Sequence, residues 1–324
     1  MYFRKIRKPV LIAACLLLMT LGGCSLTRNA PVLEPEAEVK ELGMCTSFYP
    51  IYIMTLNITK DVPGIRLTNI SAPDTGCLHE VQLSPAELKL LEQSEIFIIN
   101  GLGMEGYLDK VIESLPNLKV VDSSRNLNLT SLRSGISEDY TVSKEHEIHE
   151  KHDSHINPHT WVSISLAIEQ VKNIGEQLSN LDPKNREQYL KNTEDYIAIL
   201  QDLKVRMHEG LADINSREII TFHEAFHYFA QEFNLDIQAV VQREPGSEPS
   251  AKELAETINL VQENRIKAIF VEPQYSDSAA QAIARETRAK VYTLDPAVTG
   301  PLVTDAYILA MEENLLTLQE ALKE

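Results

Sequence analysis

Histidine and acidic residues crowd one short stretch of the chain, Lys144–Trp161, which holds five of the nine histidines. Four of these histidines recur at every third position and the fifth follows a proline: His146, His149, His152, His155 and His159. Imidazole is a good ligand for zinc, and a solvated run of histidine and acid holds such ions loosely. The stretch therefore indicates metal binding; its composition leaves open a polar surface loop without a function.

Three further candidate ligands for a divalent metal lie elsewhere in the sequence: His79, His223 and Asp295. With His159 they make three imidazoles and one carboxylate, a set that suits tetrahedral zinc. Any one of the four, taken alone, is more simply explained as a loop or capping residue. Their joint position in the expected fold is what indicates a metal site.

Short apolar runs alternate with amphipathic segments from Met44 onward, and the pattern occurs twice. The first half predicts strands at residues 44–48, 65–71, 95–100 and 118–123, with helices at 50–59, 84–91 and 105–115. The second half predicts strands at 218–222, 237–242, 266–272 and 290–294, with helices at 225–233, from 250, at 278–288 and at 304–322. Such alternation is typical of α/β folds with parallel sheets. We therefore expect two similar (βα)4 lobes.

Between the two halves, residues 165–178 predict a first helix. A second, longer helix is predicted after Pro183, because the chain continues from there to about Glu209 without glycine or proline. At 1.5 Å per residue this helix would be roughly 40 Å long. A flexible hinge would show glycine or serine clusters, so we expect a rigid helix between the lobes. The expected organisation is an N-terminal lobe with the His-rich loop at 144–157, linking helices, and a C-terminal lobe, at residues 43–164, 165–214 and 215–324.

The candidate ligands all stand in loops at the ends of predicted strands or helices. His79 follows the strand 65–71 through a loop, and His159 precedes a helix. His223 and Asp295 directly follow predicted strands of the second half. Ligands of open α/β sheets bind outside the carboxyl ends of the strands. Two candidates come from each half, so one ion in the cleft between the lobes could collect all four.

Residues 1–23 have the pattern of a secretory signal. Four basic residues precede the apolar run Val10–Leu21, and small residues lead to a cysteine in Leu21–Cys24. This Leu-Gly-Gly-Cys resembles the lipobox of bacterial lipoproteins, which implies cleavage before Cys24 and lipidation of that cysteine. An ordinary cleaved signal with an incidental cysteine is the alternative. Residues 24–42 are expected to be a tether between lipid and domain.

Cleavage would leave 301 of the 324 residues and, with the loss of four basic residues, would take the net charge from −17 to −21. Such an acidic chain is a poor candidate for nucleic-acid binding, which needs basic patches. Cys45 and Cys77 would remain as a pair in an oxidising compartment, which indicates a disulfide. Two buried free thiols are the alternative, because sequence spacing does not show that the two cysteines meet.

The chain resembles the metal-binding receptor lipoproteins of bacterial ABC importers, the zinc/manganese class, over about residues 46–322. The motifs that carry the resemblance are Thr46–Pro50, Cys77–Glu80, Leu83–Pro85, Asn100–Glu105, Asn157–Trp161, Phe222–Phe226, Phe270–Pro273 and Leu294–Pro296. The resemblance implies two α/β lobes joined by a rigid helix, with the metal held between them by ligands at the positions of His79, His159, His223 and Asp295.

The resemblance also implies zinc as the transported ion, because manganese members tend to carry glutamate where this chain has His223. The adjacent Glu224 keeps a manganese or iron receptor open as the alternative. The His-rich loop is typical of the zinc members and is expected to act as an auxiliary collector. The chain departs from the family pattern at Leu78, where proline is common, and at Asn157, where aspartate is common.

The partners implied by the resemblance are an ABC permease and its ATPase, with a role in cell adhesion also associated with the family. No nucleotide-binding loop is present, so the ATPase must be a separate chain. We expect a monomer that is not an enzyme, anchored outside the cytoplasm through its N-terminal lipid. Glu105, Glu272, His208 and His227 are interpreted as structural or surface residues.

Two other functions compete with this reading. The sequence His223–His227 is a literal H-E-x-x-H, the zinc motif of metalloproteases. Because it abuts the predicted strand 218–222, His223 falls at the start of a helix and not inside one; Glu232, Glu244 and Glu248 remain available as further ligands. The second alternative is a surface adhesin or structural lipoprotein whose His-rich loop only stores metal.

Overall fold

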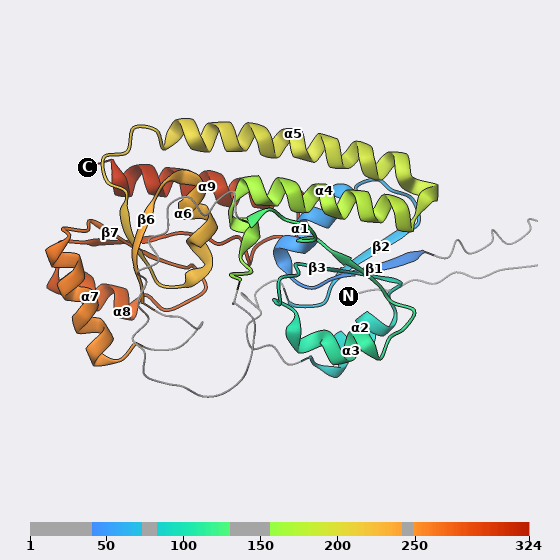
Figure 1. The fold of residues 1–324 in the computed structure, drawn as a ribbon, viewed down its shortest axis with the longest axis horizontal. Helices are drawn as coiled ribbons and strands as arrows, with labels where there is room; N and C mark the ends of the chain where they lie inside the picture. Colours follow the sequence, from blue (N-terminus) through green and yellow to red (C-terminus); the bar gives the residue numbers. More distant parts are fainter. Residues whose placement is uncertain (1–40, 73–82, 130–155, 242–248, 324) are drawn as a thin grey trace, which may run out of the picture. The chain divides into compact units, whose positions relative to one another are not determined.

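The computed structural model describes residues 41–72, 83–129, 156–241 and 249–323. Residues 40–324 form one compact unit, which contains two four-stranded parallel sheets with the orders β2-β1-β3-β4 and β6-β5-β7-β8 (Figure 1). The two sheets have the same order of strands, so the predicted pair of similar α/β lobes is confirmed. Within the described ranges, no helix is both long and apolar enough to cross a membrane.

The N-terminal lobe follows the predicted alternation. Its strands are β1 (Leu42–Thr46), β2 (Ile65–Asn69), β3 (Ile96–Ile99) and β4 (Lys119–Asp122). Its helices are α1 (Tyr49–Ile58), α2 (Pro85–Glu92) and α3 (Asp109–Glu113), with a 3₁₀ turn η1 (Gly106–Leu108) before α3. Ser84 and Glu87 form the predicted capping box at the start of α2. The single helix expected at 105–115 is wrong, because Gly106 has a low helix propensity and the first turn is 3₁₀.

The C-terminal lobe repeats this architecture. Its strands are β5 (Glu218–Thr221), β6 (Asp236–Val240), β7 (Ala268–Val271) and β8 (Lys290–Thr293). Its helices are α6 (His227–Phe233), α7 (Ala251–Glu263), α8 (Ser278–Glu286) and α9 (Ala306–Leu322), and a 3₁₀ turn η5 (Glu224–Phe226) precedes α6. Ser250 and Glu253 form the second capping box.

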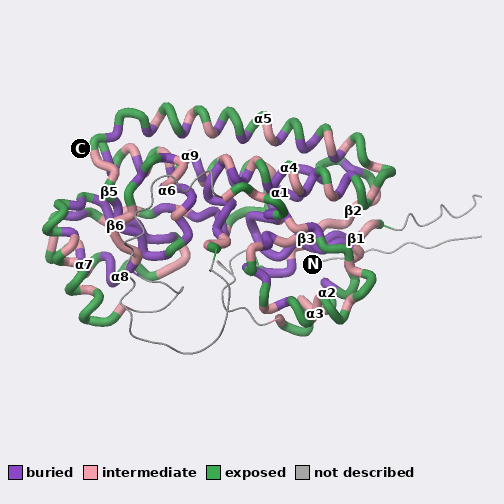
Figure 2. The backbone as a smooth tube through the Cα atoms, viewed as in Figure 1, coloured by how far each residue is buried: buried purple, intermediate pink, exposed green. Residues whose placement is uncertain are grey.

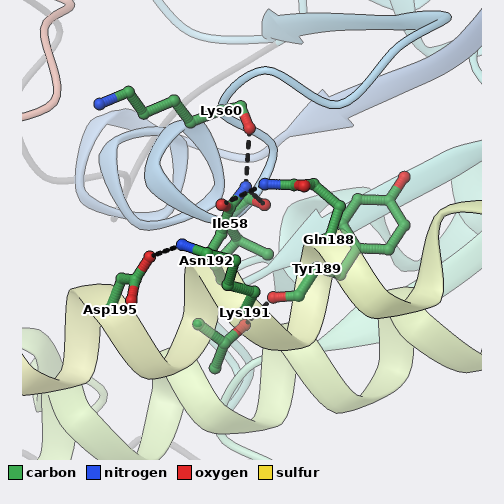
Figure 3. Close-up of polar contacts among 8 residues, drawn as sticks. Ile58, Lys60, Gln188, Tyr189, Lys191, Asn192 and Asp195 are labelled. Atoms are coloured by element: carbon green, nitrogen blue, oxygen red, sulfur yellow. Dashed lines mark hydrogen bonds and ion pairs between the residues drawn. The ribbon is translucent and has the colours of Figure 1, made fainter.

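Two long helices connect the lobes, α4 (Ile164–Leu181) and α5 (Arg186–Gly210), and short 3₁₀ turns precede each of them: η3 (Thr160–Val162) and η4 (Pro183–Asn185). The 25 residues of α5 correspond to roughly 38 Å. Helix α5 is attached to both lobes. Near its start, Asn192 donates to the carbonyls of Ile58 and Lys60 (Figure 3); at its end, the Gly210 carbonyl accepts from Gln319 of α9.

The two lobes share one hydrophobic core. Its largest cluster contains side chains of β1, β3, α1, α4, α5, α6, β7 and α9, so no solvent layer separates the lobes along the linking helices. Figure 2 shows this core as the buried inner sides of α1, α4 and α9, with the exposed side of α5 outside it. A continuous core resists relative motion because packed interiors have few voids. The expectation of a rigid helical connection agrees with this packing.

Cys45 of β1 is fully buried and carries a free thiol, which corrects the disulfide with Cys77 expected from the sequence. Burial raises the pKa of the thiol to about 11, so it stays protonated and unreactive at neutral pH. For Cys45 this agrees with the alternative interpretation, in which the two cysteines are buried free thiols. Cys77, Cys24 and the signal segment lie outside the described residues.

Candidate metal centre

Two of the predicted ligands meet inside the protein. His159 immediately precedes the turn η3, and His223 lies between β5 and η5 in an extended conformation with φ −128° and ψ 154°. Their Nε2 atoms are 3.2 Å apart, and their rings form an edge-to-face pair with centroids 5.0 Å apart. The exposed fractions of the two residues are 0% and 2%. The structure therefore joins residues from opposite lobes in one buried imidazole pair.

The separation of the two nitrogens suits a shared metal ion. With zinc–nitrogen bonds of about 2.0–2.1 Å, two nitrogens of a tetrahedral ion stand about 3.3–3.4 Å apart. The observed 3.2 Å between His159 Nε2 and His223 Nε2 is close to this value. The distance between the two nitrogens is therefore compatible with a shared ion, provided that neither nitrogen keeps a proton.

Asn157 orients the His159 ring. Its Oδ1 accepts from the His159 backbone amide at 2.9 Å and lies 2.8 Å from His159 Nδ1. An amide oxygen only accepts, so Nδ1 carries the proton and Nε2 keeps its lone pair. Asn157 is itself held by bonds from its Nδ2 to the Glu224 carbonyl and from the Tyr228 hydroxyl to its carbonyl, both 2.9 Å. The residue that departs from the family pattern thus still does the positioning expected of a carboxylate there.

Trp161 joins the segment of His159 to the segment that follows β8. Its ring centroid is 5.2 Å from that of His159, and its Nε1 donates to the Pro296 carbonyl at 2.8 Å. The Tyr307 hydroxyl of α9 donates to the Trp161 carbonyl at 2.7 Å. Because Pro296 follows Asp295, this indole ties the surroundings of one predicted ligand to those of another.

Asp295 is held mainly through its backbone. Asn314 of α9 accepts from the Asp295 amide at 2.8 Å and donates to its carbonyl at 2.7 Å. The side-chain Oδ1 accepts from the Ala297 amide at 2.7 Å. Burial raises the pKa of Asp295 above its ordinary value. An anion that is costly to bury alone becomes favourable beside a divalent cation.

Glu272 is a further buried carboxylate close to Asp295. It directly follows β7 and is 2% exposed. Burial, and then the charge of Asp295, raises its pKa to about 8, and Gln274 Nε2 donates to its Oε2 at 2.5 Å. Of the two interpretations given for Glu272, a structural or a surface residue, its burial agrees with the structural one. Its position after a strand was the available signal, the same one that indicated His223.

The N-terminal lobe holds the backbone ahead of His159. The buried carboxylate of Glu105, the residue before η1, accepts from the amides of Asn100 and Gly101, which follow β3, at 2.7 and 3.0 Å. Burial raises the pKa of Glu105 to about 7. Asn100 Nδ2 in turn donates to the Pro158 carbonyl at 2.9 Å. Glu105 is therefore a structural residue, as expected, and its network ends one residue before His159.

The full set of four ligands stays a prediction. Within residues 41–72, 83–129, 156–241 and 249–323, no three His, Cys, Asp or Glu side chains form a group that could hold a metal ion. The third predicted histidine and the histidines of the loop lie outside the described residues: His79, His146, His149, His152 and His155. The structure thus brings together His159 and His223, and Trp161 links the segment of His159 to Pro296, the residue after Asp295.

The H-E-x-x-H motif does not lie in one α-helix. His223 is extended and directs Nε2 at His159, whereas His227 begins α6 with its Nε2 3.2 Å from Gln231 Nε2. Desolvation lowers the pKa of His227. Glu232, one of the suggested protease ligands, is bonded to Ser163 and Ser165 instead. The geometry that would place both histidines on one helix face is absent from this described segment.

Comparisons of the sequence with a family model and with known proteins point to the same family. Residues 44–321 match the family described as "Zinc-uptake complex component A periplasmic". The chain is 31% identical to the "High-affinity zinc uptake system protein ZnuA" of Bacillus subtilis (strain 168), over 99% of this chain and 98% of that protein.

Two further relatives extend the comparison. The chain is 28% identical to the "Zinc-binding lipoprotein AdcA" of Streptococcus pneumoniae (strain ATCC BAA-255 / R6), over 97% of this chain, and spans 61% of that protein's length. The solved structure of FpvC from Pseudomonas aeruginosa in complex with Mn²⁺ superposes with a TM-score of 0.71 at 26% identity, over 87% of this chain and 98% of that chain. Relatives that bind zinc and a relative that holds manganese therefore share this fold.

Proposed function

The chain belongs to the zinc-uptake complex component A family, and we propose that it captures zinc outside the cytoplasm and delivers it to an ABC permease. The single observation that carries the proposal is the buried pair of His159 and His223, whose Nε2 atoms are 3.2 Å apart. Two imidazoles from opposite lobes with facing ring nitrogens are suited to bind one transition-metal ion.

The proposed ligands are His79, His159, His223 and Asp295. Three neutral imidazoles and one carboxylate leave one positive charge on bound zinc, which the buried Glu272 beside Asp295 would help to balance. The donor set is richer in nitrogen than manganese prefers, since manganese favours carboxylate, carbonyl and water. The manganese relative keeps a manganese receptor as the second candidate.

The mechanism is capture without a chemical step. Zinc enters between the lobes and displaces solvent and protons from the ligands. The shared core and the two attachments of α5 keep the lobes nearly fixed, so the affinity depends on how well the ligands are positioned beforehand. Release then requires the permease to bind both lobes and disturb this arrangement, with energy from ATP hydrolysis on a separate subunit.

The proposed location of the chain rests on its N-terminal sequence. We propose cleavage of residues 1–23, lipidation of Cys24 and a tether over 24–42, which would hold a monomeric receptor at the outer side of the membrane. The proposed domains are the N-terminal lobe at 43–164, the linking helices at 165–214 and the C-terminal lobe at 215–324. We propose no enzymatic activity.

A zinc titration of the full chain, with and without residues 146–155, tests the proposed function. We expect one tight site per chain in both proteins, since the ligands at the lobes do not depend on the loop. The loop should add only weaker sites, measured by competition with a zinc chelator and by metal analysis. Loss of all binding on deletion would favour a storage protein, and stronger retention of manganese than of zinc would favour the second candidate.

The affinity for zinc should fall as the pH falls below about 6. Imidazole, with an ordinary pKa of about 6.5, binds metal only in its neutral form, so protons and zinc compete for the same nitrogen lone pairs. The dissociation constant, measured by chelator competition between about pH 5 and 8, should rise steeply on the acid side. A constant affinity across this range would contradict ligation by histidine.

A further inference from the structure

Glu232 is a buried residue of α6 whose carboxylate accepts hydrogen bonds from the start of α4. Its side chain is 3% exposed. Oε2 accepts from the Ser163 hydroxyl at 2.5 Å, Oε1 accepts from the Ser165 hydroxyl at 2.6 Å, and the Ser165 amide lies 3.1 and 3.2 Å from the two oxygens. The contact joins residues 67 and 69 positions apart in the sequence.

The chemistry of this contact explains why a carboxylate is there. Ser163 is the N-cap of the 18-residue helix α4, and its hydroxyl also accepts from the Leu166 amide. The Ser165 amide is one of the donors that a helix start leaves without an intrahelical partner, and the positive end of the helix dipole attracts an anion. His208, 44% exposed, has its Nε2 3.9 Å from Oε1 and is therefore at most a weak partner. Glu232 thus acts mainly as a cap supplied by another helix.

The two helices joined by Glu232 are the ones that follow the imidazole pair. Only the turn η3 and Ser163 separate His159 from α4, and only the turn η5 separates His223 from α6. A shift of the α4 start against α6 would therefore move the two histidines relative to each other. The bonds from Asn157 and Tyr228 cross between the same segments, but Glu232 makes the charged contact.

We propose that Glu232 is a positioning residue for the metal pair: it fixes the separation of His159 and His223 at the distance one ion requires. The inference rests on the proposed function, because it concerns the affinity of the same site. Glu232 does not touch the metal in this account. It acts through the starts of α4 and α6, as outer residues of metal sites commonly act through the ligands.

The test is the variant Glu232→Gln in the full chain. Glutamine keeps the size of the side chain but lacks the charge and places an NH₂ group against donors of α4, so the contact loosens. We expect the zinc dissociation constant to rise by about tenfold to 100-fold, the usual effect of losing an outer residue of a metal site. The visible spectrum of bound Co²⁺, which reports the ligand geometry, should change as well. A purely stabilising role would leave that spectrum unchanged.

The capping box of α7 provides the matched control. Ser250 and Glu253 also join a serine and a glutamate at a helix start in the C-terminal lobe, but α7 carries no proposed ligand. Glu253→Gln should lower the melting temperature without altering zinc affinity or the Co²⁺ spectrum. Ser165→Ala, which removes only one donor to Glu232, should weaken zinc about threefold to tenfold, and combining it with Glu232→Gln should add little.

The outcomes distinguish the positioning role of Glu232 from the proposed zinc-binding function. Unchanged zinc affinity and an unchanged Co²⁺ spectrum in Glu232→Gln would overturn the positioning role while leaving the proposed function intact. Failure of the wild-type chain to bind zinc tightly would instead overturn the proposed function. If Glu232→Gln does not fold, Ser165→Ala carries the test alone, and wild-type affinity in that variant would overturn the role.

Discussion

Among single substitutions at the residues that the structure describes, His223→Ala should weaken zinc binding the most. A four-ligand zinc site contributes about 10–16 kcal/mol, so one ligand accounts for about 2.5–4 kcal/mol. Since every 1.4 kcal/mol is a factor of ten, we expect the dissociation constant to rise about 100-fold to 1,000-fold. The fold should persist, because His223 lies in a loop between β5 and η5. Chelator competition at neutral pH measures the change.

His227→Ala is the matched control for this prediction. The two histidines are four residues apart in the same motif, but His227 directs its Nε2 at Gln231 while His223 directs its Nε2 at His159. The control should keep the wild-type zinc affinity within about threefold, as expected for a residue that is not a ligand. Equal losses in the two variants would instead point to a site built on the H-E-x-x-H motif.

Trp161→Ala should be the most destabilising single substitution that removes no proposed ligand. The indole is fully buried in the core shared by both lobes, in edge-to-face contact with Phe48 at 4.9 Å. Truncating a buried tryptophan costs about 3–5 kcal/mol of unfolding free energy, and the bond from Nε1 to the Pro296 carbonyl is lost with it. Urea unfolding of the metal-free chain, analysed by linear extrapolation, measures the loss.

Trp161→Phe separates packing from hydrogen bonding. Phenylalanine keeps an aromatic ring in the core but has no donor for the Pro296 carbonyl, so we expect a loss of about 1–3 kcal/mol. If the unfolding free energy of Trp161→Ala were within about 1 kcal/mol of the wild-type value, the claim that both lobes share one core at this residue would be contradicted.

Much of the fold could be predicted because its signals are local. The serine and glutamate of each capping box lie three residues apart, and both boxes formed as expected at Ser84 and Ser250. Apolar residues of α5 recur at helical spacing, and the same residues are buried. The apolar pattern does not predict the 3₁₀ turns η1 and η5, because they depend on how each helix start packs.

The candidate site was predictable only in part. The position of His159 before a helix of the first half, and of His223 directly after a strand of the second half, predicts that they meet, and the structure brings them together. The residues that hold them were missed. Glu232 meets Ser163 across 69 positions and Asn314 meets Asp295 across 19, and no sequence motif marks such pairs. By comparison with the family pattern, Asn157 lacks the carboxylate that is common there, yet its amide oxygen holds the His159 ring.

A crystal structure of the zinc-loaded chain, with the ion located by anomalous scattering at the zinc edge, tests the central claim most directly. We expect one ion between the lobes, bound by Nε2 of His159 and Nε2 of His223, with His79 and Asp295 completing a tetrahedron at the bond lengths usual for zinc. An ion held elsewhere, with His159 and His223 still in contact with each other and not with the metal, would contradict it.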